Sequence, residues 1–311
     1  MTSYRPIALL AGILLLGVAP TFAQSPFDEI EPAMPELDLP GLNQYAPTIA
    51  DDGSEQFRTV VLEAKLTEDA PLLKDGLVWR VFDSVPGPDG KLPLVASSEG
   101  GSAEMTFPPG DYFLHVAFGR AAVSKKLQVP TEGPVGRQSI TLNAGGLVLN
   151  ARSGEDMRIP PGELSFSVYD ASDGANDERR LVIADVKPDT VIGLNAGTYH
   201  VVSEYGDLNA SIRSDIYIEA GKLTEATIQH RAAELTLKLV SERGGEAIAD
   251  TAWSILTASG DPISESVGAF STIILSEGTY TAVARNKDNV YQRDFTVHAG
   301  VNTDVEVMLS Q

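Results

Sequence analysis

Apolar and polar residues alternate along most of the chain, in short runs separated by Gly, Pro, Asn and Asp. Alternation with a period of two is typical of half-buried strands, and the separating residues are typical of turns. Beyond residue 58, no segment of useful length keeps the 3.6-residue period of an amphipathic helix. The pattern therefore predicts an all-β protein.

The alternating runs recur in three copies. In each copy a large aromatic residue stands in a strand-like run, and a tyrosine that opens another such run follows 33, 33 and 27 residues later. The three aromatic residues are 87 residues apart, and a glycine lies two positions before each tyrosine. These landmarks are Trp79, Gly110 and Tyr112, then Phe166, Gly197 and Tyr199, then Trp253, Gly278 and Tyr280. Repetition of this kind indicates tandem domains of one type.

Each copy contains about seven short alternating runs, which is the number of strands typical of a two-sheet sandwich. We therefore predict three tandem seven-stranded antiparallel β-sandwiches over residues 59–143, 144–231 and 232–311. The joint at 143–146 contains two glycines and is expected to allow some bending, whereas residues 230–233 suggest nearly continuous strands. The aromatic residues of the central runs are expected to lie in the cores: Trp79, Phe82, Phe166, Tyr169 and Trp253.

The glycine before each tyrosine follows a predicted strand directly, as in a tight hairpin where one residue needs a positive φ. We expect the tyrosine ring to pack at the edge of the sandwich and its hydroxyl to reach the backbone. The alternative is a row of three tyrosines that contacts a ligand.

The Gly-Asp-Tyr or Gly-Thr-Tyr turn, the polar hairpin before it and the Ala-Gly turn before the last strand carry a resemblance. They are similar to the Ig-like or carboxypeptidase-regulatory-like (transthyretin-like) sandwich modules that occur in tandem in secreted bacterial proteins. The resemblance implies a β-sandwich fold and a non-catalytic module with no substrate. It covers residues 59–311, and it departs from true immunoglobulin domains because both core cysteines are missing.

Residues 1–23 have the pattern of a secretory signal peptide. Arg5 precedes an apolar run over 7–18, and Thr21 and Ala23 place small residues before a cleavage site after Ala23. The alternative, a membrane anchor, needs about 20 apolar residues, more than this run offers. We therefore predict a secreted or periplasmic protein whose mature chain does not insert into a membrane.

Residues 24–58 contain five prolines and eight acidic residues against the single Arg58. A segment of this composition buries too little apolar surface to offset its ordering entropy, so we predict a disordered acidic linker. Within it, acidic and apolar residues alternate over 27–40. Two interpretations stay open for this stretch, a solvated spacer and a docking peptide for a partner.

The net charge of −20 argues against nucleic-acid binding, which depends on Lys and Arg contacts to phosphates. The chain has no cysteine, which removes disulfides, thiolate metal sites and cysteine nucleophiles. Its four histidines have no metal-ligand spacing, and neither a serine-hydrolase motif nor a phosphate-binding loop is present. The sequence therefore predicts neither an enzyme nor a cofactor.

One acidic loop offers oxygen ligands of the kind that calcium prefers. The spacing is not that of an EF-hand, and a polar turn between two strands explains the same residues, so they form only a weak calcium candidate: Asp170, Asp173, Asn176 and Asp177.

Taken together, these features predict an exported, non-enzymatic binding or scaffold protein of the cell envelope. Its repeats would act as protein-interaction or spacer modules, with an envelope protein or a glycan of unknown identity as partner. The alternative is a carbohydrate or cell-wall binding module, for which Tyr205, Tyr217 and Tyr291 are the candidates for exposed aromatic residues.

Overall fold

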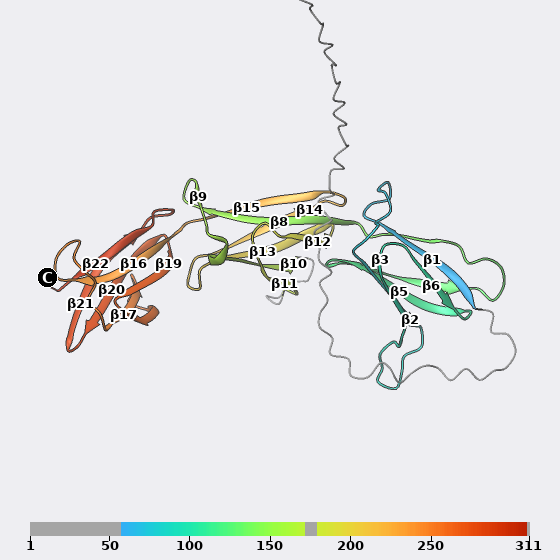
Figure 1. Ribbon diagram of the computed structural model, residues 1–311, viewed down its shortest axis with the longest axis horizontal. Coiled ribbons are helices and arrows are strands. Elements are labelled where there is room, and N and C mark those ends of the chain that lie inside the picture. The colour runs from blue at the N-terminus through green and yellow to red at the C-terminus, as the bar shows by residue number, and fades with distance from the viewer. Residues whose placement is uncertain (1–56, 172–178, 310–311) are drawn as a thin grey trace, which may run out of the picture.

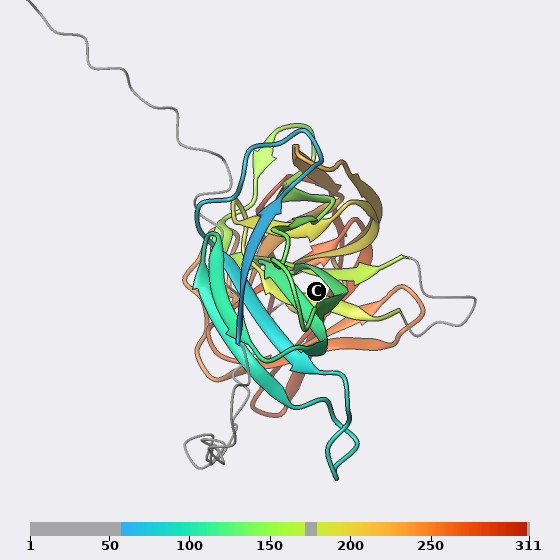
Figure 2. The same cartoon turned by 90° about the vertical axis from the view of Figure 1, so that its right-hand side faces the viewer.

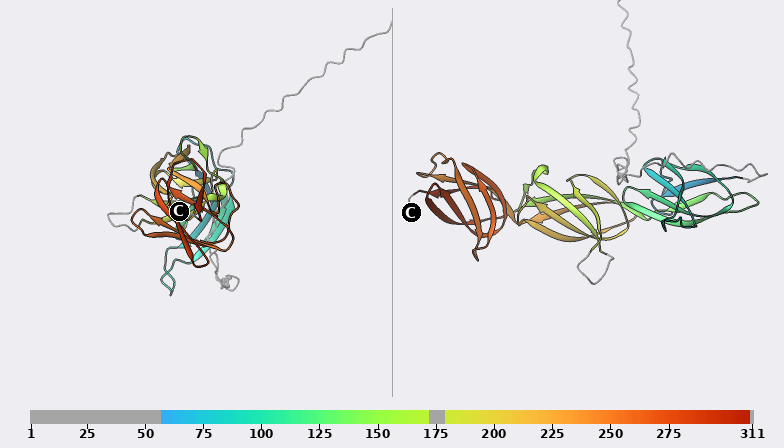
Figure 3. Two further views of the ribbon diagram at one scale, coloured as in Figure 1. Left: turned by 90° about the vertical axis from the view of Figure 1, so that its left-hand side faces the viewer. Right: turned by 90° about the horizontal axis from the view of Figure 1, so that it is seen from below.

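The structure is a computed structural model that describes residues 57–171 and 179–309. The predicted signal peptide, and the predicted linker up to residue 56, lie outside the described residues. The described residues form three β-sandwiches that lie in a row (Figure 1), and the same row is seen from below in Figure 3. Viewed from the end of the first sandwich, the three lie one behind another (Figure 2).

The first sandwich consists of a three-stranded sheet, β4-β1-β7, and a four-stranded sheet, β3-β2-β5-β6. Arg58, which the sequence placed in the linker, is the first residue of β1 and pairs with Phe107. The strands are β1 (Arg58–Lys65), β2 (Leu77–Asp83), β3 (Leu94–Gly100), β4 (Ala103–Phe107), β5 (Gly110–Phe118), β6 (Ala121–Val129) and β7 (Gln138–Thr141).

The second sandwich repeats this arrangement with the sheets β12-β8-β15 and β11-β10-β13-β14. It adds one short strand, β9, which pairs with β8, and a 3-10 helix at Pro161–Glu163. The strands are β8 (Ala144–Ser153), β9 (Met157–Arg158), β10 (Leu164–Asp170), β11 (Leu181–Val186), β12 (Val191–Asn195), β13 (Gly197–Tyr205), β14 (Ser211–Ile218) and β15 (Leu223–His230).

The third sandwich has the sheets β19-β16-β22 and β18-β17-β20-β21. Its strands are β16 (Ala232–Val240), β17 (Thr251–Thr257), β18 (Pro262–Val267), β19 (Phe270–Ser276), β20 (Gly278–Asn286), β21 (Asn289–Val297) and β22 (Thr303–Met308). The predicted fold class, all-β with three tandem sandwiches, is confirmed.

The sequence predicted antiparallel pairing throughout, but each sandwich contains one parallel pair. In each sandwich the last strand lies parallel to the first: β7 beside β1, β15 beside β8 and β22 beside β16. The reason lies in the topology, because the last strand arrives from the opposite sheet and enters beside the first strand in the same direction. The first strand is therefore the central strand of its three-stranded sheet.

The segment before each landmark tyrosine is not a hairpin, because the strands on its two sides belong to different sheets: β4 and β5, β12 and β13, and β19 and β20. The chain thus crosses from one sheet to the other at this point. Of the three glycines only Gly197 has a positive φ, of 151°, so the expected requirement for a left-handed residue fails at Gly110 and Gly278.

A β-bulge recurs at one place in all three sandwiches. The register of the edge strand shifts opposite Val81 and Phe82 in the first, Val168 and Tyr169 in the second, and Ile255 and Leu256 in the third. Bulges on edge strands hinder pairing with strands of other molecules. The repeat therefore extends to a feature that the residue pattern did not indicate.

Candidate functional site: the joints between the sandwiches

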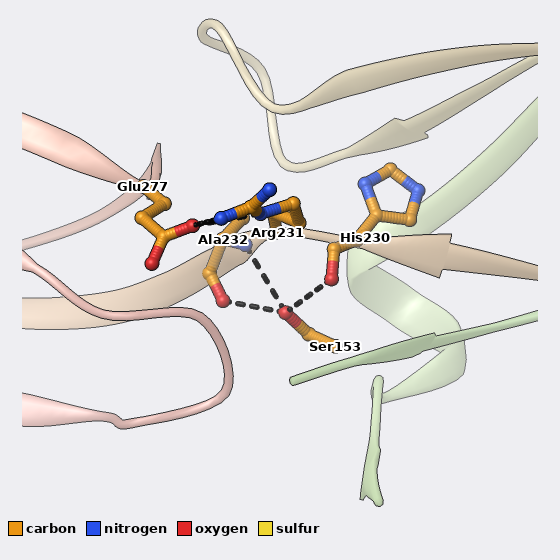
Figure 4. Close-up of polar contacts among 5 residues, drawn as sticks. All are labelled: Ser153, His230, Arg231, Ala232 and Glu277. Atoms are coloured by element: carbon orange, nitrogen blue, oxygen red, sulfur yellow. Dashed lines mark hydrogen bonds and ion pairs between the residues drawn. The ribbon is translucent and has the colours of Figure 1, made fainter. Parts of the chain in front are cut away.

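The joint between the second and third sandwiches is built around Ser153, a completely buried residue at the end of β8 (Figure 4). The hydroxyl of Ser153 lies 2.5 Å from the carbonyl oxygen of Ala232 and 3.3 Å from that of His230, and it accepts a bond from the amide of Ala232 at 3.2 Å. Only Arg231 separates β15 from β16. The hydroxyl therefore fixes the chain on both sides of the crossing point.

Charged and backbone groups make further contacts in the same joint. The Nε of Arg231 donates to Oε2 of Glu277 at 2.7 Å, and the amide of Glu277 donates to the carbonyl of Arg231 at 2.7 Å. Gly154 and Gly300 bring two turns into backbone contact, since a Cβ on Gly300 would lie 2.8 Å from the Cα of Gly154. Contacts of this kind leave little room for the two sandwiches to rotate against each other.

A hairpin of the second sandwich also docks on the third. The side chain of Asn209 donates to the hydroxyl of Tyr280 at 2.9 Å and accepts from the amide of Ser276 at 2.9 Å. Leu208 packs against the core of the third sandwich, and Ile274 belongs to the core of the second. The two hydrophobic cores are thus linked across the joint.

The joint between the first and second sandwiches uses an equivalent hairpin. The amide of Arg120 donates to the carbonyl of Gly193 at 2.9 Å. Asn195 accepts from the amide of Ala122 at 3.1 Å and donates to the carbonyl of Leu142 at 3.0 Å. Asn195 of β12 therefore bonds both to β6, in the hairpin of the first sandwich, and to the chain that connects the two sandwiches.

Residues 143–146 were expected to allow some bending, but residues 144–146 are held in a paired strand. Ala144, Gly145 and Gly146 form the start of β8 and pair with β12, and Gly146 also pairs with Leu223 of β15. Gly145 allows the backbone to approach the turn after β14, because a Cβ there would lie 2.3 Å from the carbonyl oxygen of Glu219. These glycines thus serve close packing and not flexibility.

His230 is buried beside the joint, with 1 % of its surface exposed. Its Nε2 lies 2.8 Å from the hydroxyl of Ser203, and its ring meets that of Tyr205 edge-on at 6.0 Å. A serine beside a histidine can act as a nucleophile with its base, but Ser203 is completely buried. The pair is therefore a structural contact in the core.

Burial lowers the pKa of His230 from 6.5 to about 4. The unfolded chain takes up this proton near pH 6.5, so the second sandwich loses stability as the pH falls from 6.5 toward 4 and loses nothing further from this group below 4. We expect a loss of about 2 to 3 kcal/mol from this residue. Urea unfolding at pH 7, 5 and 4 measures it, and His230→Gln should unfold with a smaller loss over that interval. An equal loss in both proteins would contradict the assignment.

The landmark residues lie at equivalent places in the three cores. Trp79 and Phe166 are completely buried, and Trp253 nearly so. Both indole N–H groups donate to a glycine carbonyl where the chain changes sheets, Trp79 to Gly101 at 2.8 Å and Trp253 to Gly268 at 3.1 Å. The ring of Phe166 has no N–H group, so the second sandwich fills this core position without the corresponding hydrogen bond.

Each landmark tyrosine hydroxyl donates to the carbonyl oxygen four residues earlier. The distances are 3.0 Å from Tyr112 to Pro108, 3.1 Å from Tyr199 to Asn195 and 2.9 Å from Tyr280 to Ser276. All three side chains are buried. The tyrosines therefore lock the crossing between the sheets, and their burial is at odds with a row of ligand contacts.

Two aromatic residues predicted to be in the cores are not there. Phe82 pairs with Phe113, and Tyr169 pairs with His200, on the outer face of the four-stranded sheets, where all four are partly exposed. The reason is the strand period: Phe82 and Tyr169 lie three residues after the buried Trp79 and Phe166 and so point to the opposite face.

The three tyrosines considered for carbohydrate binding do not share an exposed face. Tyr205 is 1 % exposed, Tyr291 packs against the core of the third sandwich, and Tyr217 is 64 % exposed.

Of the four calcium candidates, only Asp170 is described, and it forms an ion pair with Arg180 at 2.8 Å. Asp173, Asn176 and Asp177 lie outside the described residues. Elsewhere in the described ranges, no three His, Asp or Glu side chains gather as metal ligands would.

The described part of the chain has no helix long and apolar enough to cross a membrane. Residues 234–309, which span most of the third sandwich, match a family described as the Rhizobiales growth-associated tandem repeat domain. No curated protein sequence matches the chain.

Among solved structures, the Bacillus anthracis TIE protein is 16 % identical with a TM-score of 0.23, over 81 % of this chain and 50 % of its own length. A streptococcal ancillary pilin is 14 % identical with a TM-score of 0.26, over 81 % and 99 %. BcpA, the major pilin subunit of Bacillus cereus, is 10 % identical with a TM-score of 0.24, over 82 % and 100 %. This chain thus spans half the length of the TIE protein. The family match and the strand topology together describe a protein of repeated β-sandwich domains.

Proposed function

We propose that this protein is an exported, non-enzymatic scaffold of the cell envelope, in which three sandwiches form a short rigid rod that spaces or binds a protein partner. The observation that carries this proposal is the construction of the two joints. Each joint is closed by an asparagine that bonds across it, by backbone hydrogen bonds and by apolar contacts between neighbouring cores. A spacer needs a fixed length, and such joints supply one.

The division into repeats supports a finer assignment. The matched family is a growth-associated tandem repeat, and its match covers one of three copies that share the same landmarks. We assign all three sandwiches, over 59–143, 144–231 and 232–311, to one type of Ig-like or carboxypeptidase-regulatory-like module. On the description of that family, we propose a growth-associated role for the rod as a whole.

The same proposal includes the location of the protein outside the cytoplasm. A signal peptide over 1–23 would export the chain to the periplasm or the cell surface, and the acidic residues 24–56 would form a linker that precedes the rod. The linker is the more acidic part of the chain for its length, so a basic partner is the one that it would recruit. Its binding would weaken as salt screens exposed charges, over about 8 Å at 0.15 M.

Crosslinking and pull-down of the mature protein from its own envelope tests the proposal. We expect the mature chain to capture one or a few envelope proteins. If the rod is the binding part, a variant that lacks residues 24–56 should capture the same proteins. Loss of the partner with the linker would assign binding to the linker. Capture of glycan alone would contradict the proposal in favour of the carbohydrate-binding alternative.

A further inference from the structure

The short strand β9 distinguishes the second sandwich from the other two. After β8 the chain turns at Gly154 and comes back as Met157–Arg158, which pairs antiparallel with the end of β8. In the first sandwich, the corresponding connection makes only a single bridge, between Lys65 and Leu72. The second sandwich therefore carries a small additional hairpin on its three-stranded sheet.

This hairpin places two arginines directly opposite each other. Arg152 of β8 and Arg158 of β9 are cross-strand partners, and their side chains are 56 % and 72 % exposed. Like charges directly opposite each other destabilise an antiparallel pair. In a chain with a net charge of −20, a pair of facing arginines is a feature that folding alone does not require.

The arginines line a surface pocket of about 380 Å³. Asn150 and Thr227, which are partners in the parallel pair of β8 and β15, continue the pocket along the outer face of the sheet. Its size lies within the range of small-ligand pockets. The remaining lining residues are Ala151 and Asp156.

The acidic neighbours of the two arginines differ in how firmly they are held. Asp156 is 91 % exposed and lies 3.5 Å from Arg152, a surface ion pair that is worth about 0 to 1 kcal/mol. Asp189 is fixed by Asn150 at 2.5 Å and lies 3.3 Å from Arg158. An incoming anion would displace Asp156 at small cost and leave two guanidinium groups in the pocket, because Asp189 is not one of the lining residues.

We propose that this pocket binds an oxyanion, a carboxylate or phosphate group displayed by an envelope polymer. The guanidinium group presents parallel N–H donors that match two oxygens of such a group. An anion between Arg152 and Arg158 would bond to both side chains and remove their mutual repulsion. The hydroxyl of Thr227 lies on the same face and would bond to a further oxygen. The choice of an envelope polymer rests on the proposed location of the protein, whereas the anion site itself lies on the outer face of one sandwich and does not depend on the spacer role.

Thermal unfolding of the full mature chain tests the site, with inorganic phosphate, glucuronate and glucose added at constant ionic strength. We expect phosphate, glucuronate or both to raise the melting temperature with a saturable dependence, and glucose to have no effect. A response to phosphate alone points to phosphate-bearing polymers and a response to glucuronate alone to uronic acids, while a response to both supports the shared chemistry.

Arg158→Gln provides the decisive variant. It should weaken anion binding at least tenfold. Its melting temperature without anion should stay close to that of the natural protein, because the repulsion from Arg152 and the exposed ion pair with Asp189 are lost together. Arg213→Gln, at an exposed arginine on the other sheet of the same sandwich, is the matched control and should bind normally. The proposal fails if neither anion stabilises the protein, or if Arg158→Gln and Arg213→Gln respond alike.

Discussion

Substitution of Phe166 by alanine is expected to lower the free energy of unfolding of the second sandwich by about 3 to 5 kcal/mol. Phe166 has no exposed surface and lies in the strand β10 between Val186 of β11 and Ser203 of β13. Removing its ring deletes apolar contacts and leaves a cavity that the surrounding strands close only in part. Urea unfolding followed by circular dichroism measures the loss.

The matched control for this prediction is Tyr169→Ala, on the same strand three residues later. Tyr169 is partly exposed on the outer face beside His200, so its loss is expected to cost about 1 kcal/mol or less. The comparison removes an aromatic ring in both cases and changes only the face. Equal losses would show that the outer face is as tightly packed as the core and would contradict the assignment.

The second large effect is expected at the joint. Gly300→Ala should lower the free energy of unfolding by about 3 kcal/mol, because two costs add. Gly300 has a φ of 72°, where an L-residue is strained by about 1 to 2 kcal/mol. Its new Cβ would also lie 2.8 Å from the Cα of Gly154 and from the carbonyl oxygen of Ser153. Backbone atoms cannot swing aside, so the turns must separate.

Gly260→Ala separates the two costs. Gly260 has a φ of 91° in the turn between β17 and β18, and a Cβ there would have no neighbour within 4 Å. We expect a loss of about 1 kcal/mol from strain alone. Calorimetry on both variants measures the difference, and similar losses would mean that the contact between Gly154 and Gly300 does not hold the joint.

The repeat and the fold class could be predicted because they depend on the period-two pattern and on large residues at fixed spacing. Trp79, Phe166 and Trp253 occupy equivalent core positions, and their spacing of 87 residues is visible in the sequence. The parallel pairing of first and last strands could not be predicted in the same way. Alternation identifies the buried face of a strand but does not specify the neighbour that pairs with it.

The joints show a further limit of residue patterns. Two glycines at 145 and 146 suggested flexibility, since glycine serves loops and close backbone contacts alike. Asn195 and Asn209 resemble ordinary turn residues in the sequence, yet each bonds across a joint. Their role depends on contacts between neighbouring sandwiches, which the pattern of a single copy does not contain. The facing arginines likewise required the register of β8 and β9.

The rigidity of the rod is tested most directly by one distance measurement. The natural chain has no cysteine, so spin labels attached to Gln128→Cys and Thr296→Cys report only on these sites. Both residues are exposed on equivalent edge strands of the first and third sandwiches, next to the partners of Tyr112 and Tyr280. Pulsed electron resonance should give a single narrow distribution of distances. A broad distribution, or several populations, would contradict a rod with fixed joints.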